Sequence, residues 1–332
     1  MKGLKNKLKI VLGLLISLVF LFLAFRQLDF QQMKRAFLLA NYWLLLPSLV
    51  ILFLSHWLRA VRWRILLRPI QNISVSPLFS ALLIGYAAND VLPAHLGELV
   101  RAYLVGRKRK LPVSSALATI VVERIIDVLT LVFLMALTLV IYPFPNWVKK
   151  SGYIMFAFAI ALTVFLVMMK VYTPATMRFI HRVLNPFPQK FTEKIEQLSR
   201  SFLDGLQPMI RKSDYVLIFV LSLLIWSCYW GVLYLNFYTF NLIADYGLTP
   251  LAGLVLLVIT TISVVVPSSP GYVGTYHWLC QVSLELFHVP RAIGLSYAIV
   301  VHAINFFPVF LVGLLLAWKE GIRLSQKSIE PL

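Results

Sequence analysis

The sequence has few charged residues and no long polar region. Charged residues are 13% of the 332 residues, hydrophobic residues are 60%, and the mean hydropathy is +0.84. These values exclude an ordinary soluble globular domain. The longest polar stretch, residues 173–214, is too short for a soluble catalytic domain. We therefore expect one polytopic membrane domain over residues 1–332, with residues 173–213 as a cytoplasmic amphipathic loop within it.

Cysteines and the motifs of several enzyme classes are also scarce. The two cysteines, Cys228 and Cys280, both lie in apolar segments, so they are expected as small buried side chains rather than as a disulfide or a metal site. The sequence has no Gly-x-x-x-x-Gly-Lys-Ser/Thr loop and no Gly-x-Ser-x-Gly elbow. We expect no metal, no cofactor and no enzymatic activity, and any transport would be passive or ion-coupled.

Six apolar stretches are each close to the roughly 20 residues that a helix needs to cross a bilayer. The first follows a basic start and has no small-x-small cleavage site after it, so it is expected to be a retained span rather than a signal peptide. The chain is therefore predicted to be an all-α integral membrane protein. The predicted spans cover residues 10–25, 42–58, 115–142, 152–171, 215–240 and 292–318.

Two further apolar stretches are interrupted. Residues 76–106 break at 91–98, and residues 249–288 break at 267–274. Backbone polar groups at membrane depth must be buried in protein or line a wet cavity, and paired Pro/Gly breaks in two halves of a chain point to the substrate site of a transporter-like fold. We predict two re-entrant helical hairpins related by an inverted repeat, with tips that meet near the midplane. Eight full crossings give the same end orientations and stay open as an alternative.

The basic residues are distributed unevenly. Most of the 31 Lys and Arg residues fall on one side of this topology, and the net charge is +18. By the positive-inside rule this predicts cytoplasmic N- and C-termini in a cytoplasmic (inner) membrane. Arg59, Arg62, Arg64 and Arg68 are counted here as part of a cytoplasmic segment. The positive charge is explained by topology and by anionic lipid headgroups, without nucleic acid.

Polar residues gather around the first break and in the third predicted span. Charges at membrane depth are costly, so they face a partner or a cavity. One interpretation is a neutralised network that pins the broken helix to the third span. The other is a substrate site, in which one arginine stays partly free for an anionic headgroup because guanidinium suits phosphate. Both can hold together. The candidate residues are Asn89, Asp90, Pro93, Glu98, Arg101, Glu123, Arg124 and Asp127.

The second break carries hydroxyl groups and no charge. A helix that starts near Gly271 would point its N-terminal N–H groups at the midplane, which favours an anion. The alternative is a turn chosen only for backbone shape. A lipid hydrolase that uses Ser268 or Ser269 with His277 or His302 is a third interpretation, since nucleophilic catalysis needs a base next to the serine. The candidate binding residues here are Ser268, Ser269, Gly271, Tyr272 and Gly274.

Two surface helices are also predicted. Asp29 can cap a helix over residues 30–39. A second helix follows from apolar residues at three- or four-residue spacing, and it either lies on the membrane surface or packs on the protein itself. Those apolar residues are Phe191, Ile195, Leu198, Phe202 and Leu206.

Three short motifs carry a family resemblance. They are NDVLPAHLGELVRAY at residues 89–103, VERIID at 122–127 and PSSPGYVG at 267–274. Their order and spacing resemble the flippase-like membrane domain of lysylphosphatidylglycerol synthases. No stretch of this sequence resembles the aminoacyl-transferring domain of those synthases.

The resemblance implies a lipid transporter that moves an anionic headgroup, of phospholipid or polyprenyl-phosphate type, across the bilayer. A membrane-embedded lipid-modifying enzyme and a non-transporting scaffold for such an enzyme are the alternatives. Membrane lipids are the expected partners, and a homo-oligomer or a lipid-enzyme partner is left open.

Overall fold

The computed structural model describes residue 15 and residues 17–26, 28–91, 96–207, 211–265 and 270–321. All regular structure within these residues is helical. Five helices are long and apolar enough to cross a membrane, and they coincide with five of the six predicted spans. The chain is thus an all-α, multi-pass membrane protein, as predicted. The five spans are α3 (Leu45–Leu67, preceded by η1, Tyr42–Leu44), α6 (Val113–Ile141), α7 (Asn146–Val171), α10 (Lys212–Thr239) and α14 (Arg291–Lys319).

Only the end of the first predicted span lies within the described residues. Residues 17–25 are helical and pack against the C-terminal part of the chain, where Gln281 Nε2 donates to the carbonyl of Ala24 at 3.3 Å. The remaining helices are shorter. They are α2 (Phe30–Leu39), α4 (Val75–Val91), α5 (Gly97–Arg109), α8 (Thr173–Leu184), α9 (Gln189–Gly205), α11 (Leu242–Tyr246), α12 (Pro250–Val265), the 3₁₀ turn η3 (Pro270–Tyr272) and α13 (Thr275–Glu285).

The prediction for the end of the second span is wrong. Helix α3 continues past residue 58 to Leu67 without interruption. Arg59 and Arg62 are therefore buried residues of this helix, whereas the sequence analysis assigned them to a cytoplasmic segment. Hydropathy alone predicts that a span ends before its first arginine. The helix can continue within the membrane when other helices supply partners for the charged side chains.

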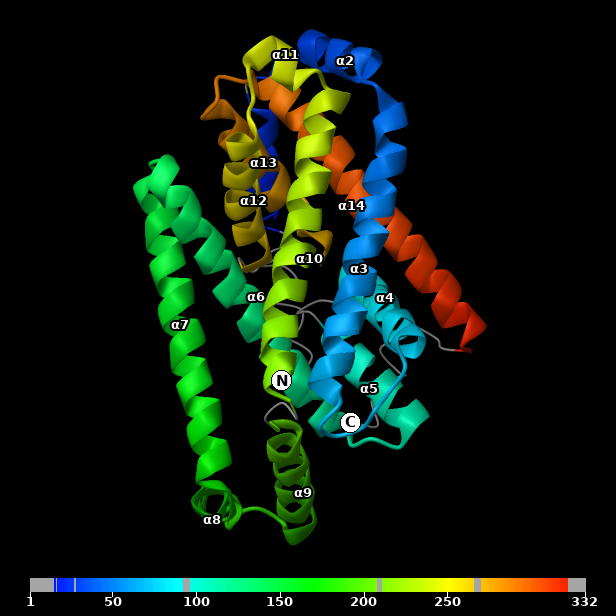
Figure 1. The fold of residues 1–332 in the computed structure, drawn as a ribbon, viewed down its shortest axis with the longest axis vertical. Coiled ribbons are helices and arrows are strands. Elements are labelled where there is room, and N and C mark those ends of the chain that lie inside the picture. The colour runs from blue at the N-terminus through cyan, green and yellow to red at the C-terminus, as the bar shows by residue number, and fades with distance from the viewer. Residues whose placement is uncertain are drawn as a thin grey trace.

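The helices form two units of opposite orientation (Figure 1). The first unit is α3, α4, α5 and α6, and the second is α10, α12, α13 and α14. Matching pairs are in contact: α3 packs on α4 as α10 packs on α12, and α5 packs on α6 as α13 packs on α14. Contacts between the units also match, since α4 packs against α14 and α12 against α6. This is the arrangement expected of an inverted repeat.

Each broken stretch is a pair of packed helices. The hairpin of α4 and α5 lies in the lower half of Figure 1, and that of α12 and α13 lies in the upper half. Helix α4 has 17 residues and would extend about 25 Å. A hydrocarbon core is about 30 Å thick, so the arms are shorter than a full crossing. Of the two topologies considered, the arrangement favours re-entrant hairpins over eight crossings.

A side-chain hydrogen bond and a close glycine contact fix the first hairpin next to its break. Asn89 Oδ1 accepts a 2.7 Å hydrogen bond from the N–H of Gly97, across the break. A Cβ on Gly97 would lie 1.9 Å from the carbonyl oxygen of Gly85, so the two helices approach closely only because both positions are glycine.

The two hairpins meet inside the molecule. The turn η3 of the second hairpin contacts α4 of the first. Tyr272 also interacts electrostatically with Asp90, Glu98 and Arg124. The predicted tip residues Pro93 and Pro267 lie outside the described residues, but their described neighbours converge as the prediction requires.

Both predicted surface helices are present. Asp29 caps α2 by accepting from the N–H groups of Gln31 and Gln32, each at 2.9 Å. In α9, Leu203 is buried at the end that packs on α6, whereas Phe191 and Leu198 remain 47% and 40% exposed. The protein therefore leaves part of the apolar side of α9 uncovered.

Candidate functional site

Seven charged side chains from three helices meet next to the first hairpin. We call this group the arginine cluster. Helix α3 contributes two arginines, α5 contributes a glutamate and an arginine, and α6 contributes one arginine and two carboxylates. Its members are Arg59, Arg62, Glu98, Arg101, Glu123, Arg124 and Asp127.

Glu123 is the centre of the cluster and is completely buried. Its Oε1 accepts from Arg59 Nη2 at 2.7 Å, and its Oε2 accepts from Arg101 Nη2 at 2.5 Å. The side chain therefore joins α3, α5 and α6 at one point. The network interpretation of the sequence analysis correctly expected the first hairpin to be pinned to the third predicted span, but it lacked the two arginines of α3.

Asp127 is the second shared carboxylate, one turn further along α6. It accepts from Arg59 Nη2 at 2.7 Å and from Arg62 Nη2 at 2.5 Å. Arg62 also donates to Ser222 Oγ of α10 at 2.9 Å. The carboxylates of α6 thus hold α3 along two successive turns, and α10 completes the enclosure.

Arg124 differs from the other three arginines because its side chain is partly accessible. It is 36% exposed, whereas the side chain of Arg101 is 2% exposed. Its Nε lies 2.8 Å from Glu98 Oε1, and its Nη1 lies 3.5 Å from Asp127 Oδ2. Arg101 is shielded further by Trp63, whose ring centre lies 3.6 Å from the Arg101 Cζ. Of the four guanidinium groups, Arg124 is the one that a ligand could reach first.

The cluster has more hydrogen-bond donors than acceptors. Four arginines face three carboxylates, which leaves one net positive charge. The buried Nε groups of Arg59, Arg62 and Arg101 have no hydrogen-bond partner among the residues that the structure describes. His56, one turn before Arg59 on α3, is buried, and neither of its ring nitrogens has a hydrogen-bond partner within the described part of the chain. Unpaired buried donors cost about 1–3 kcal/mol each, so an added acceptor with negative charge would be favoured here.

Sequence reasoning missed Arg59, Arg62 and His56. The available signal was spacing: Arg59 and Arg62 are three residues apart and continue the face of a helix that is apolar before them. A basic residue at the end of an apolar run is usually a topology signal, and only the carboxylates of α6 show that these two are buried.

The turn of the second hairpin carries no charge among its described residues. Gly271, Tyr272 and Gly274 all have positive φ angles, of 72°, 56° and 92°. The carbonyl of Gly271 accepts from His302 Nε2 at 2.8 Å, and the N–H of Gly274 donates to His277 Nδ1 at 3.3 Å. The turn is therefore held by α13 and α14 through two histidines.

The serines of this turn, Ser268 and Ser269, lie outside the described residues, as does the predicted pairing of either serine with His277 or His302. Among the residues that the structure describes, no group of three His, Cys, Asp or Glu side chains could hold a metal ion.

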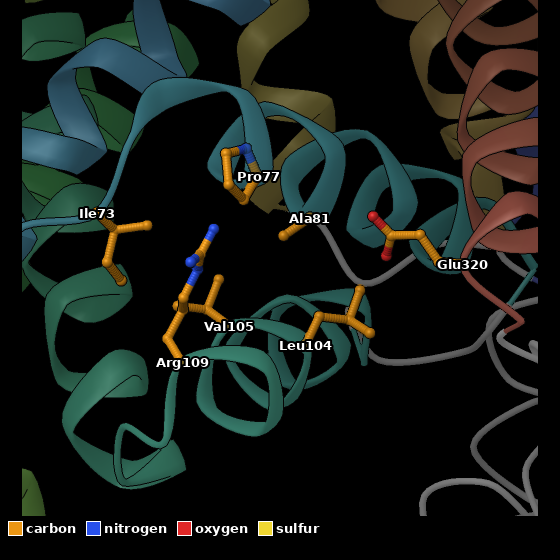
Figure 2. A pocket seen from close by; sticks show the side chains of 7 residues that line it. All are labelled: Ile73, Pro77, Ala81, Leu104, Val105, Arg109 and Glu320. Atoms are coloured by element: carbon orange, nitrogen blue, oxygen red, sulfur yellow. The ribbon is translucent and has the colours of Figure 1, made fainter.

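A small cavity lies at the other end of the first hairpin, between the start of α4 and the end of α5 (Figure 2). Arg109 and Glu320 line it from opposite sides, and Pro77 and Ala81 lie between them. Its volume of about 10 Å³ holds one water molecule at most. This cavity is too small for a lipid headgroup, and its residues are not those of the arginine cluster.

The sequence is similar to those of several known membrane proteins. Residues 10–313 match the family described as lysylphosphatidylglycerol synthase TM region. A UPF0104 membrane protein of Methanothermobacter thermautotrophicus is 26% identical over 302 residues, which are 86% of this chain and 88% of that protein. A second UPF0104 membrane protein, MJ1595 of Methanocaldococcus jannaschii, is 20% identical over 312 residues, which are 90% of this chain and 91% of that protein.

A third relative is matched only in part. The glycosyltransferase AglD of Haloferax volcanii is 33% identical over 136 residues, which are 41% of this chain and 22% of that protein. No solved structure matches the chain.

Proposed function

The chain belongs to the family of lysylphosphatidylglycerol synthase transmembrane regions, and from this premise we propose that it moves the anionic headgroup of a membrane lipid between the leaflets. The arginine cluster binds the headgroup, and the turn of the second hairpin faces it from the other half of the bilayer. The basic loops and both termini lie on the cytoplasmic side of an inner membrane.

The observation that carries this proposal is the excess of buried donors in the arginine cluster. A phosphate group brings oxygen acceptors and negative charge to a place where four guanidinium groups face only three carboxylates. Arginine binds phosphate through two parallel N–H donors, and such charge-assisted bonds are about twice as strong as neutral ones. In hydrocarbon no water competes for these donors, so the binding gains further strength.

The four arginines have different parts in this proposal. Arg124 meets the headgroup, because its side chain is partly exposed and because Tyr272 of the second hairpin lies within electrostatic range of it. Arg101 is held by Glu123 and Trp63, so in this proposal it attracts the headgroup by its charge without touching it. Arg59 and Arg62 hold the carboxylates in place, so that Glu123 and Asp127 do not repel the incoming phosphate.

The inverted arrangement supplies the route. In this proposal each hairpin enters from its own side of the membrane, and the turn η3 of the second hairpin contacts α4 of the first. Movement of one hairpin at a time would open the cluster to one leaflet at a time, which is how inverted-repeat transporters alternate their access.

The relatives are consistent with a phosphate-linked lipid but do not identify it. Lysylphosphatidylglycerol is a phospholipid, and the partly matched relative is named a glycosyltransferase. The common chemistry that we propose for the substrate is a lipid phosphate, of phospholipid or polyprenyl-phosphate type.

The test is reconstitution of the full chain into liposomes with fluorescent lipids. Leaflet exposure of fluorescent phosphatidylglycerol is followed against fluorescent phosphatidylcholine, with wild type, Arg124→Gln and the control Arg109→Gln. We expect transport of the anionic lipid by wild type and the control, and loss of at least about tenfold in Arg124→Gln, since one such pair is worth about 1.5–3 kcal/mol. No transport of any tested lipid by folded wild type would reject the proposal and favour a scaffold for a lipid-modifying enzyme.

A further inference from the structure

The proposed headgroup site leaves two buried histidines of the second hairpin without a role. His277 of α13 and His302 of α14 lie edge to face, with ring centres 4.8 Å apart and an interplanar angle of 83°. His277 is buried and His302 is largely buried. Each ring is hydrogen-bonded to the backbone of the same turn, so the pair joins two helices at the point where the second hairpin reverses.

The bond of His302 fixes the proton on that ring. The carbonyl oxygen of Gly271 can only accept, and it lies 2.8 Å from His302 Nε2. His302 Nε2 therefore carries a hydrogen, and in the neutral ring its Nδ1 is the nitrogen that can take up a proton. Tyr276 stacks on this ring at 5.2 Å and 28°, and Phe306 packs on it at 5.8 Å. A proton added to His302 Nδ1 leaves the bond to Gly271 intact.

The bond of His277 has the opposite polarity. The N–H of Gly274 donates to His277 Nδ1 at 3.3 Å, so this nitrogen carries no hydrogen and His277 is neutral. A proton added at Nδ1 would place one N–H against another and break the bond. Gly274 is the N-cap of α13, with a φ angle of 92°, so the turn depends on this contact at a strained position.

The surroundings contain no compensating charge among the described residues. From α13 and α14 the neighbours are the aromatic rings of Tyr276 and Phe306. From the N-terminal helical segment, the carbonyl of Ser17 approaches Gly274. The charged groups that interact with the same turn are Asp90, Glu98 and Arg124, and they do so through Tyr272. A proton on this pair would therefore lack a counter-charge in the present arrangement.

We propose that His277 and His302 form a proton-binding site that couples proton entry to release of the second hairpin turn. A proton from water binds Nδ1 of His277, the hydrogen bond from Gly274 breaks, and the turn separates from α13. Since two cations 4.8 Å apart repel each other, the pair takes one proton at a time, and the turn is released only when that proton is on His277. Loss of that proton to the other side restores the bond and closes the turn. The ligand of this site is the proton, and the proposal adds an energy source to the proposed function.

The first experiment uses variants that keep the hydrogen bonds and remove the titration. Asn at position 277 offers Oδ1 in place of Nδ1, and Gln at position 302 offers its amide N–H in place of Nε2–H. Wild type and the double variant H277N/H302Q are placed in nanodiscs, and amide hydrogen exchange is measured over residues 271–285 at pH 8 and pH 5.5. Comparison at equal pH removes the intrinsic pH dependence of exchange.

At pH 8 the two proteins are expected to exchange alike. At pH 5.5 wild type should exchange at least about tenfold faster than the variant in this region only, because the turn opens locally. His181→Gln is the control, since His181 is an exposed histidine of α8 bonded to Glu196, and it should behave as wild type. Equal exchange of wild type and variant at both pH values overturns the proposal. If the double variant loses protection throughout α3 and α10, His277→Asn alone gives the same comparison, because only His277 loses its bond on protonation.

The second experiment distinguishes this site from the headgroup site. Liposomes with fluorescent phosphatidylglycerol receive a pH gradient of either direction. Wild type should change its rate several-fold with the gradient, and the double variant should not. Transport that ignores the gradient, with no pH effect on exchange, rejects the proton site and leaves the proposed function standing. A pH effect on hydrogen exchange without any lipid transport rejects the proposed function and leaves the proton site standing.

Discussion

The two hairpins occupy matching places in the inverted arrangement but are held in different ways. The first is fixed by ion pairs. Glu123 of α6, for example, accepts from Arg59 of α3 at 2.7 Å and from Arg101 of α5 at 2.5 Å. The described turn of the second is held by two neutral hydrogen bonds, of 2.8 and 3.3 Å, to histidines. Buried ion pairs are strongly destabilised when one partner is lost, whereas a neutral hydrogen bond contributes about 1 kcal/mol. The comparison predicts that the first hairpin is held more rigidly than the described turn of the second.

The largest expected effect is the loss of a buried arginine at the first hairpin. Arg62→Ala leaves Asp127 with one strong partner fewer and should lower the stability by about 3–5 kcal/mol, seen as a lower melting temperature and less folded protein in the membrane. Arg124→Ala should cost less, since that side chain is partly exposed, and Arg109→Ala should cost little. Equal melting temperatures for the three variants would show that the first hairpin does not depend on the cluster.

The corresponding change at the second hairpin is Gly274→Ala. Its φ angle is 92°, and a Cβ would lie 2.5 Å from the carbonyl oxygen of Ser17. We expect a loss of about 1–3 kcal/mol, with faster hydrogen exchange in α13. Gly247→Ala is the matched control, because Gly247 also has a positive φ, of 65°, but has no atom within 4 Å of its Cβ position. A control as destabilised as Gly274→Ala would mean that backbone strain alone decides, rather than contact with the N-terminal segment.

A smaller effect is expected when charge is kept and geometry is changed. Arg124→Lys retains the positive charge but loses the planar pair of donors, so affinity for the anionic lipid should fall about tenfold, or about 1.4 kcal/mol. Native mass spectrometry of copurified lipid measures this, with Arg109→Lys as the control. If lipid binding survives in Arg124→Lys but not in Arg101→Lys, then Arg101 rather than Arg124 meets the headgroup.

The smallest predicted effect concerns the closure of the first hairpin. Asn89→Ala removes the acceptor for the N–H of Gly97 and should cost about 0.5–1.5 kcal/mol, measured by thermal unfolding. Asn89→Asp, which keeps an acceptor, should retain more of the stability. A loss as large as that of Arg62→Ala would mean that a single neutral bond holds this hairpin as firmly as the ion pairs, which contradicts the comparison above.

Hydropathy was sufficient to predict five long spans and both interrupted stretches. A membrane helix forms its backbone hydrogen bonds internally and needs apolar side chains toward the lipid. Its position can therefore be predicted from the length and hydropathy of one continuous segment. The five predicted spans agree with the described helices to within a few residues at most ends. The predicted start of α7, at residue 152, is six residues later than the observed start at Asn146. The largest difference is at the end of α3, where Arg59 and Arg62 were taken for the start of a loop.

The candidate site was predicted in part. Glu98, Arg101, Glu123, Arg124 and Asp127 lie on two neighbouring segments with three- and four-residue spacing, and the structure brings all five together. The role of Asn89 as an acceptor for Gly97 and the histidine contacts of the second turn were not predicted. These contacts depend on which helices cross, and side-chain spacing within one segment carries no information on that.

The sequence by itself determined that this protein spans a membrane, where its helices break and that charges occur at depth, because each of these follows from the transfer of local segments out of water. Only the tertiary structure decided which charges neutralise one another. In the sequence, Arg59 and Arg62 indicate only the cytoplasmic end of a span. In the structure they pair with Glu123 and Asp127 of α6, which are more than 60 residues away in the chain. A lone arginine in hydrocarbon is excluded by its desolvation cost, and a paired one is stable, so the meaning of these residues depends on the partner that folding places beside them.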